Sequence, residues 1–301
     1  MKIGVVIQLV ELRDLKRAMT YKEIQAIASL CESLGFDSIW VYDHLLYREK
    51  KNETIGIWES WSMLSALAAT TNKIELGTLV SCNSFRNPAL LAKMAHTVDE
   101  ISNGRLILGL GAGWNQPEYD AFGLPFDHRV DRFEEALKII KPLLKEGKVD
   151  FSGRYYSARN CEITPRSPRP GGPPLLIGAR QHRMLRLAAQ YADIWNVCYM
   201  TIPRSMDTMY RSMMKACKDV GRDPDTLQFT FAISQAFPDL AGWTKNTKRG
   251  WLTGSVDKIA EVLTEYDAKG ADELMFHLNP STPDAYERLA RSMEIYRSHQ
   301  G

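Results

Sequence analysis

Residues 74–110, IELGTLVSCNSFRNPALLAKMAHTVDEISNGRLILGL, contain the unit from which the fold is built. A short apolar run at 74–80 is followed by a segment of helical period that opens with Pro88, and then by a second apolar run at 105–110. Apolar runs without strict alternation are typical of parallel strands that are covered on both faces. Proline is favoured in the first turn of a helix. The stretch therefore predicts a strand, a crossover helix and a second, parallel strand.

The same alternation continues in both directions along the chain. Strands are predicted at 3–7, 38–42, 74–80, 105–110, 174–178, 193–198, 227–233 and 272–278. Helices are predicted at 20–34, 58–70, 88–102, 131–145, 181–191, 204–219, 255–268 and 283–298. Such a series has two main solutions, a closed (β/α)₈ barrel or a doubly wound open sheet, and the count of strands favours the barrel. The predicted class is therefore α/β, a (β/α)₈ TIM barrel with insertions.

Nothing in the composition divides the chain, because neither a Pro/Ser-rich linker nor a shift in composition interrupts the alternation. We therefore predict one domain over residues 1–301. Gly35 and Gly270 precede predicted strands, where the C-terminal cap of a helix is expected. The longest irregular stretches are 115–130, 151–173 and 236–253, and the last two are interpreted as excursions from the barrel.

Composition excludes several classes of protein. With 45% hydrophobic and 25% charged residues, the chain is apolar enough to bury a core and is not disordered. The 38 Lys and Arg nearly balance 36 Asp and Glu, which argues against a nucleic-acid or membrane-surface partner. Five scattered cysteines without a C-x-x-C pair indicate a reducing compartment. Without an apolar run of membrane length or a signal peptide, the sequence predicts a soluble cytoplasmic protein.

The second predicted strand ends in Asp43 and His44, and barrel enzymes carry their chemistry at the C-terminal ends of strands. Asp43 could accept a hydrogen bond from a ligand while His44 exchanges a proton near neutral pH. Alternatively, Asp43 caps a turn and His44 packs beneath it. Arg86 could hold an anion, although pairing with a neighbouring carboxylate is favoured. Cys82 receives no role, because the sequence identifies no base beside it.

Two glycine-containing turns follow later strands. The series 109–115, GLGAGWN, would let the backbone approach a ligand closely. It resembles half of a dinucleotide fingerprint, but its strand is the fourth and 114–117 does not begin a clean helix, so a Rossmann fold is disfavoured. Gly178, Ala179 and Arg180 lead into a helix and form either a phosphate cradle or an ordinary barrel turn. No metal site is predicted.

Longer motifs give a resemblance to a known family. Together with Asp43-His44, the stretches 77–126, 151–156 (FSGRYY) and 173–196 (PPLLIGARQHRMLRLAAQYADIWN) resemble the luciferase-like monooxygenase superfamily. Within this superfamily, the sequences of these motifs are most similar to those of the coenzyme F420-dependent oxidoreductase branch. The resemblance implies a bacterial luciferase-like barrel that binds a flavin or deazaflavin at the strand ends, and a homodimer.

The resemblance also implies roles for particular residues. Asp43 would contact the cofactor, His44 would lie beside the reacting ring as the catalytic residue, and a non-prolyl cis peptide at Leu79-Val80 would support the ring from behind. The ribityl chain and phosphate would be held by Asn83, Gly111, Ala112, Gly113, Asn115, Gly178, Ala179 and Arg180. Many relatives have two glycines where this chain has Gly178-Ala179.

The activity that the resemblance implies is hydride transfer between coenzyme F420 and a small organic substrate. The alternatives are an FMN-dependent monooxygenase of the same superfamily and a flavin-binding member without turnover. In the stretch 236–253, Lys245, Lys248 and Arg249 could meet an acidic cofactor tail, although a solvated loop is favoured. Trp243 and Trp251 could wall a pocket for a planar ligand.

Overall fold

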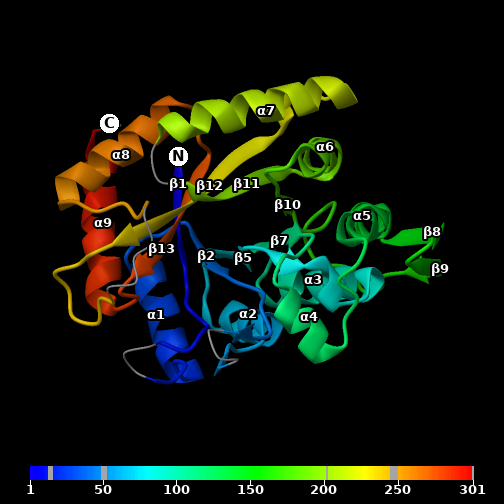
Figure 1. Ribbon diagram of the computed structural model, residues 1–301, viewed down its shortest axis with the longest axis horizontal. Coiled ribbons are helices and arrows are strands. Elements are labelled where there is room, and N and C mark those ends of the chain that lie inside the picture. Colours follow the sequence, from blue (N-terminus) through cyan, green and yellow to red (C-terminus); the bar gives the residue numbers. More distant parts are fainter. Residues whose placement is uncertain (13–15, 49–52, 201–202, 245–249, 300–301) are drawn as a thin grey trace.

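The computed structural model describes residues 1–12, 16–48, 53–200, 203–244 and 250–299, and within them parallel strands close into a barrel (Figure 1). Adjacent strands pair in sequence order, and pairing of the last with the first and of the fourth with the fifth completes the ring. The barrel strands are β1 (Lys2–Val6), β2 (Ser38–Val41), β5 (Glu75–Thr78), β7 (Leu106–Gly111), β10 (Leu175–Gly178), β11 (Ile194–Met200), β12 (Gln228–Ala236) and β13 (Glu273–Asn279). The predicted barrel and all of its predicted strands are confirmed.

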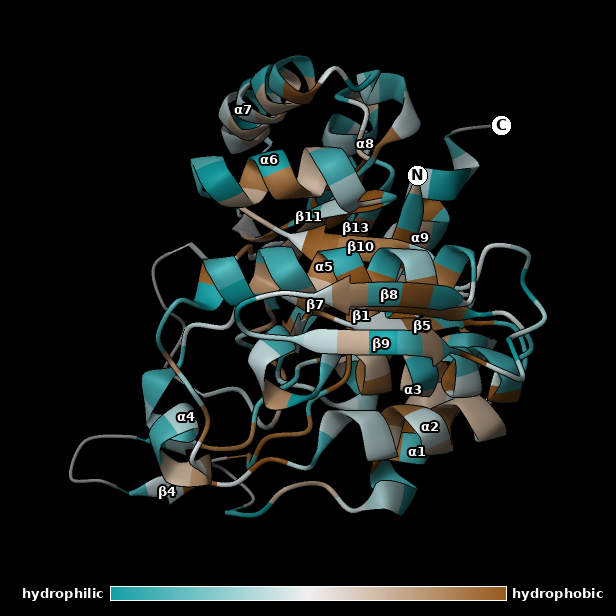
Figure 2. Cartoon of the chain, turned by 90° about the vertical axis from the view of Figure 1, so that its right-hand side faces the viewer, coloured by the Kyte–Doolittle hydropathy of each residue, from teal (hydrophilic) through white to brown (hydrophobic). Residues whose placement is uncertain are grey.

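Helices surround the barrel and turn their polar faces outward (Figure 2). Thr20 forms a capping box with Glu23 at the first helix, as its spacing predicts. Gly35 and Gly270 adopt φ of 77° and 81° just after helices, which confirms their predicted capping position. The predicted helices are α1 (Tyr21–Ser33), α2 (Ser60–Thr70), α3 (Pro88–Ile101), α5 (Arg129–Lys145), α6 (His182–Tyr191), α7 (Arg204–Val220), α8 (Val256–Ala268) and α9 (Pro283–Ser298).

Two of the stretches expected to be irregular contain regular structure. An antiparallel pair, β8 (Lys148–Ser152) and β9 (Ser157–Glu162), projects from the barrel beside α5, and α4 (Gln116–Phe122) follows β7 (Figure 1). The prediction that 114–117 begins no helix is wrong, because Gln116 and Pro117 occupy the first turn of α4. Short elements complete the chain: β3 (Tyr47–Arg48), β4 (Thr54–Ile55), β6 (Ser81–Cys82) and 3₁₀ turns at Asn83–Phe85 and Pro224–Thr226.

The barrel interior is filled, so it forms a floor rather than a pore. Inward-facing side chains from all of the barrel strands form one apolar cluster, and Tyr42, Val80 and Cys198 pack above it. A larger apolar layer separates the strands from the helices. The interior cluster consists of Val6, Trp40, Leu79, Ile107, Leu176, Ile194, Ala232 and Met275.

A buried carboxyl at the bottom of this interior makes the stability of the fold depend on pH. Glu273 is 3% exposed and accepts hydrogen bonds from the Ser38 hydroxyl and from Trp40 Nε1, the latter at 3.2 Å. Burial raises the pKa of Glu273 to about 7 from an ordinary 4.5. The folded protein therefore binds a proton more tightly than the unfolded chain, so this group contributes stability below pH 4.5 that is lost as pH rises through 7.

We therefore expect Glu273→Gln to stabilise the protein at pH 8 by about 1 kcal/mol or more, with little change at pH 4. Glutamine keeps an acceptor for Ser38 and Trp40 and does not ionise. Urea unfolding of both proteins across this range measures the difference. A variant that loses stability with rising pH as steeply as the parent would contradict the assignment.

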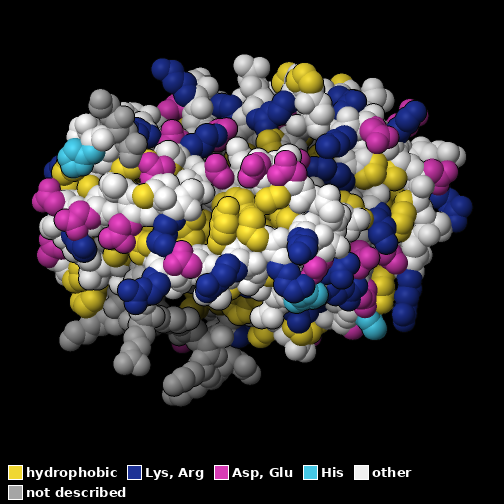
Figure 3. Space-filling model, turned by 90° about the horizontal axis from the view of Figure 1, so that it is seen from above, with side chains coloured by type: hydrophobic (Ala, Val, Ile, Leu, Met, Phe, Trp, Pro, Cys, Tyr) yellow, Lys and Arg dark blue, Asp and Glu magenta, His cyan; other side chains and the backbone are white. Residues whose placement is uncertain are grey.

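The surface carries charges of both signs. On the face seen in Figure 3, lysine and arginine are interspersed with aspartate and glutamate, in line with the formal charge of +2. All five cysteines are free thiols. In the part of the chain that the structure describes, none of the helices has the length and apolar character needed to span a membrane.

Candidate active site

A cavity of about 230 Å³ opens at the C-terminal ends of β2, β5, β7, β10 and β11, and we call it the barrel-mouth cavity. It brings together most of the predicted site residues from four separate stretches of sequence. Its lining consists of Tyr42, Asp43, His44, Leu79, Val80, Ser81, Cys82, Gly113, Trp114, Glu118, Gly178, Ala179, Arg180, Asn196 and Cys198.

The floor of this cavity is the bulge at the end of β5, where the Leu79-Val80 peptide is cis, as the family resemblance implies. Val80 packs closely against glycines of two neighbouring strands. A Cβ added at Gly111 would lie 2.7 Å from Val80 Cγ2, and one at Gly178 would lie 3.3 Å from it. A Cβ at Gly109 would meet the Thr78 carbonyl oxygen. These glycines therefore make room for the protein's own bulge, and a role of the series toward a ligand stays a prediction.

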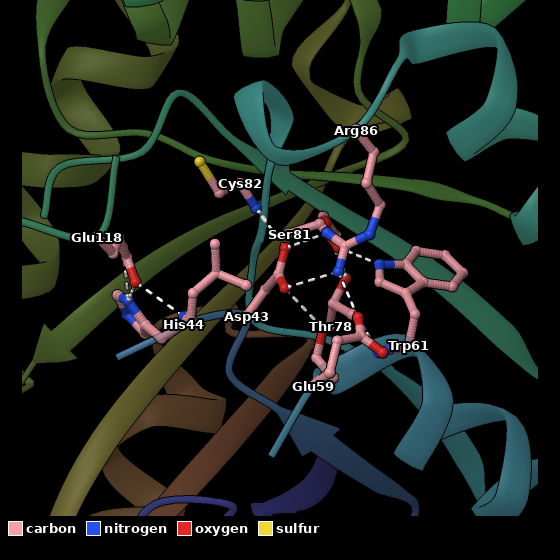
Figure 4. Close-up of polar contacts among 12 residues, drawn as sticks. Asp43, His44, Glu59, Trp61, Thr78, Ser81, Cys82, Arg86 and Glu118 are labelled. Carbon is pink, nitrogen blue, oxygen red and sulfur yellow. Dashed lines mark hydrogen bonds and ion pairs between the residues drawn. The ribbon is translucent and has the colours of Figure 1, made fainter. Parts of the chain in front are cut away.

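His44 is held by a carboxylate that the sequence analysis did not identify. Its Nδ1 lies 3.0 and 3.2 Å from the Glu118 carboxylate oxygens, and Glu118 also accepts a hydrogen bond from the Leu45 amide at 2.9 Å (Figure 4). The Glu118 side chain is 2% exposed. The arrangement places a proton on His44 Nδ1, and no partner for Nε2 is found among the residues that the structure describes. His44 can therefore exchange a proton through Nε2.

Two aromatic rings fix the His44 imidazole from its sides. Its centroid lies 4.6 Å from that of Tyr47 and 5.6 Å from that of Trp114, which is 65% exposed at the edge of the cavity. Glu118 comes from the first turn of α4, one residue after Pro117. An acidic residue just after a proline is a signal for the start of a helix, so the sequence could have predicted that α4 begins here and carries Glu118.

Asp43 lies beside His44, but its carboxylate is directed into the protein. Arg86 donates to both Asp43 oxygens at 2.7 and 3.1 Å, the Ser60 hydroxyl donates at 2.7 Å, and the Cys82 amide donates at 2.9 Å (Figure 4). Arg86 also pairs with Glu59. The favoured interpretation of Arg86 as a partner of carboxylates is confirmed, whereas contact between Asp43 and a cofactor stays a prediction. Asp43 ties the segment after the bulge to α2 and Arg86.

The two thiols at the cavity are not nucleophiles. Burial raises the pKa of Cys82 to about 12, and its Sγ lies 2.8 Å from the Tyr119 hydroxyl. Burial likewise raises the pKa of Cys198 to about 12. Both remain protonated at neutral pH, so they contribute packing and weak hydrogen bonds rather than covalent chemistry.

The side of the cavity formed by β10 has features of an anion site. Arg180 is exposed, and α6 begins two residues later; among the described residues, no side chain caps its N-terminus. An uncapped helix N-terminus with an adjacent cation favours a phosphate group. The Ala179 amide already donates to the Asn196 carbonyl at 3.1 Å, so this amide serves the sheet.

Four predicted cofactor-binding residues do not line the cavity. Asn115 donates to the Leu46 carbonyl at 3.0 Å, and Asn83 Nδ2 lies 3.4 Å from the Tyr156 hydroxyl. Gly111 and Ala112 lie in and just after β7. Their roles toward a cofactor stay predictions. Lys245, Lys248 and Arg249 fall outside the described residues.

Comparison with known proteins agrees with the barrel and its site. The profile of the family described as luciferase-like monooxygenase matches residues 1–239. The chain belongs to this family. Its barrel superposes on an F420-dependent secondary alcohol dehydrogenase solved with an F420-acetone adduct, with a TM-score of 0.81 and 18% identity over 98% of this chain and 99% of that one. A riboflavin lyase solved with modified FMN and riboflavin gives a TM-score of 0.81 and 15% identity over 100% and 92%. At these identities, the likeness shows the shared fold.

Curated relatives in the luciferase-like family include a monooxygenase and a reductase. Pyrimidine monooxygenase RutA of Klebsiella pneumoniae is 34% identical over 55% of this chain and 47% of its own length. The 5,10-methylenetetrahydromethanopterin reductase of Archaeoglobus fulgidus is 33% identical over 58% and 48%. The chain thus matches about half the length of these relatives. RutA of Pseudomonas savastanoi is 32% identical over 80% of this chain and 71% of its own length. The protein is therefore a member of an oxidoreductase and monooxygenase family.

Proposed function

We propose that the protein is a coenzyme F420-dependent oxidoreductase that transfers a hydride between the deazaflavin and a small organic substrate at the barrel-mouth cavity. The observation that supports this most directly is the pairing of cavity-lining His44 with buried Glu118 through Nδ1, which leaves Nε2 for proton exchange. A hydride acceptor such as a carbonyl also needs a proton, so the site requires a group of this kind.

The residues present fit such a cofactor. The bulge at Leu79-Val80 offers an apolar floor for a ring, and Arg180 with the start of α6 offers the charge that a phosphate needs. The cavity is smaller than the roughly 300–1,000 Å³ of typical small-molecule sites, so we expect it to take only the ring portion. The remainder would extend past Arg180 toward solvent.

When bound, the deazaflavin supplies or accepts the hydride. The chain's own residues handle the proton and the orientation. In the direction of reduction, His44 gives the Nε2 proton to the heteroatom of the substrate as the carbon bonded to that heteroatom gains the hydride. The bond between this carbon and the heteroatom then falls from double to single. Glu118 stabilises the imidazolium that precedes this transfer and holds Nδ1 protonated afterwards. In the opposite direction, Nε2 takes the proton.

The second candidate is an FMN-dependent monooxygenase, which the similarity to RutA supports, since that match covers more of the chain than the match to the reductase. A flavin-binding member without turnover is the third. Assembly as a homodimer and a cytoplasmic location also remain predictions.

Separate titrations of the protein with F420 and with FMN test the proposal. We expect F420 to bind about tenfold more tightly or better. Arg180→Met should weaken either ligand by a similar factor, because both carry a phosphate that the guanidinium would hold. Tighter binding of FMN would favour the monooxygenase, and binding without exchange of hydride would favour the non-enzymatic member.

A further inference from the structure

A second and larger cavity, of about 680 Å³, lies on the rim of the barrel beside β1 and β13. We call it the rim cavity. Its volume falls within the range of about 300–1,000 Å³ that is usual for small-molecule sites. Its lining comes from the segment that follows β1, from α1 and Met19 just before it, from Gly242, Thr244 and Trp251, and from residues 277–283, which run from the end of β13 to the start of α9. Trp251 therefore lines a cavity, as its predicted aromatic role implies.

Aromatic rings in edge-to-face and tilted contact connect the lining of the rim cavity with that of the barrel-mouth cavity. His277 lines the rim cavity, and its ring centroid lies 5.2 Å from that of Trp251 on one side. On the other side, it lies 5.8 Å from that of Tyr42, which lines the barrel-mouth cavity. The rings of His277 and Tyr42 are thus in contact, and each lines one of the two cavities. A molecule in the rim cavity would have one end next to the place where hydride transfer is proposed.

Three polar groups of this lining are buried without a hydrogen-bond partner among the described residues. They are Gln8 Nε2, His277 Nδ1 and Thr282 Oγ1. Gln8 is only 5% exposed. A buried polar group without a partner is costly and calls for an explanation, and a ligand that supplies the missing hydrogen bond is one. Gln8 lies two residues after β1, whose last residue, Val6, pairs with His277 of β13, and both side chains line the rim cavity.

The charge of the lining limits what the cavity can hold. The residues that line it in the described part of the chain include no lysine or arginine. Burial lowers the pKa of His277 to about 4, so its ring is neutral at pH 7. The carboxylates present are those of Glu11 and Glu23, and Glu23 is already held by Arg17 at 2.7 and 2.8 Å. Among the residues of the lining that the structure describes, an anion would meet these carboxylates and no counter-charge to compensate for its lost hydration.

We propose that the rim cavity binds the organic substrate of the hydride transfer, and that this substrate is an uncharged, largely apolar molecule whose hydrogen-bonding group reaches Gln8 and His277. The inference rests on the proposed function for the role of the bound molecule. Gln8 and His277 act as specificity-determining residues in it. The apolar body would lie against Leu12, Ile27, Leu30 and Trp251.

The test compares neutral and anionic probes of the same skeleton. Saturation-transfer NMR and titration of the full chain would use cyclohexanone and cyclohexanol against cyclohexanecarboxylate. We expect the neutral probes to bind about tenfold more tightly or better. Equal binding of the carboxylate, or no response to either neutral probe, would overturn the proposal.

Two variants locate the binding site. Gln8→Leu should weaken the neutral probes about 5–10-fold while leaving the thermal midpoint unchanged or raised, because it removes an unpartnered buried amide. Ala26→Phe, at an exposed position of α1 that lines the cavity, should abolish binding by filling it. Ser29→Phe adds the same side chain at an exposed position of α1 outside the lining and is the matched control. Probe binding that both cavity variants leave intact would overturn the assignment.

Cofactor titration of the same variants separates this inference from the proposed function. Affinity for F420 or FMN should be the same in Gln8→Leu, Ala26→Phe and the parent. If cofactor binds and the affinity of the neutral probes is the same in the variants as in the parent, the rim cavity is not the substrate site, and the proposed function stands. If the probes behave as expected but neither cofactor binds, the cavity assignment stands, and the proposed function fails. Loss of cofactor affinity in Ala26→Phe would assign the cavity to the cofactor instead.

Discussion

Turnover is expected to fall about 10²–10⁴-fold when His44 is replaced by alanine, with cofactor affinity nearly unchanged. His44 lines the barrel-mouth cavity, and because Glu118 occupies Nδ1 at 3.0 Å, Nε2 is the ring nitrogen left for proton exchange. Alanine removes the proton donor and acceptor. It leaves the bulge at Leu79-Val80 and the cation at Arg180, which we expect to hold the cofactor. Steady-state rates and cofactor titrations of both proteins measure the two effects separately.

Glu118→Gln is the matched control, because glutamine can still accept the hydrogen bond from His44 Nδ1 but supplies no negative charge. We expect a smaller loss of rate than in His44→Ala. If single-turnover hydride transfer in His44→Ala matched that of the parent, His44 would have no part in the proton step.

The barrel could be predicted because its signals are local and repeated. Each buried strand appears as a short apolar run, and helix starts such as Thr20 with Glu23 and Pro88 appear as capping patterns. Residues at the strand ends converge on one face in any barrel, so knowing the strands was enough to bring Asp43, His44 and Arg180 together. The convergence of these residues at one end of the barrel therefore follows from the barrel architecture alone.

What the sequence could not provide is the direction of side chains and their partners. Asp43 follows a barrel strand like a ligand-binding residue, yet its oxygens are taken by groups from three other segments. Gly111 looks like part of a ligand loop, yet it accommodates Val80. The Asp43 contacts join residues 17 to 43 positions apart in the sequence, and no local pattern encodes them. The β8-β9 pair was missed although Val149 and Phe151 alternate with polar residues.

Arg86→Met is expected to destabilise the protein by about 3–5 kcal/mol, because it leaves the Asp43 carboxylate charged and buried without its counter-ion. The Asp43 side chain is 1% exposed, and that of Arg86 is 11% exposed. Two charge-assisted hydrogen bonds would be lost, and only the Ser60 hydroxyl and the Cys82 amide would remain as donors to Asp43. Urea unfolding at neutral pH, followed by circular dichroism, measures the loss.

Arg183→Met makes the same substitution at an exposed arginine that also contacts two carboxylates, those of Asp131 and Glu134. Its side chain is 53% exposed, so we expect a loss of stability of about 1 kcal/mol or less.

Combining Arg86→Met with Asp43→Leu removes both buried charges. The double variant should recover part of the stability lost in Arg86→Met, because most of that loss comes from leaving the Asp43 charge without a counter-ion rather than from the lost attraction. Equal losses at Arg86 and Arg183 would contradict a buried ion pair. A double variant no more stable than Arg86→Met would show that Asp43 stabilises the bulge chiefly through its hydrogen bond to Cys82, because leucine cannot accept that bond.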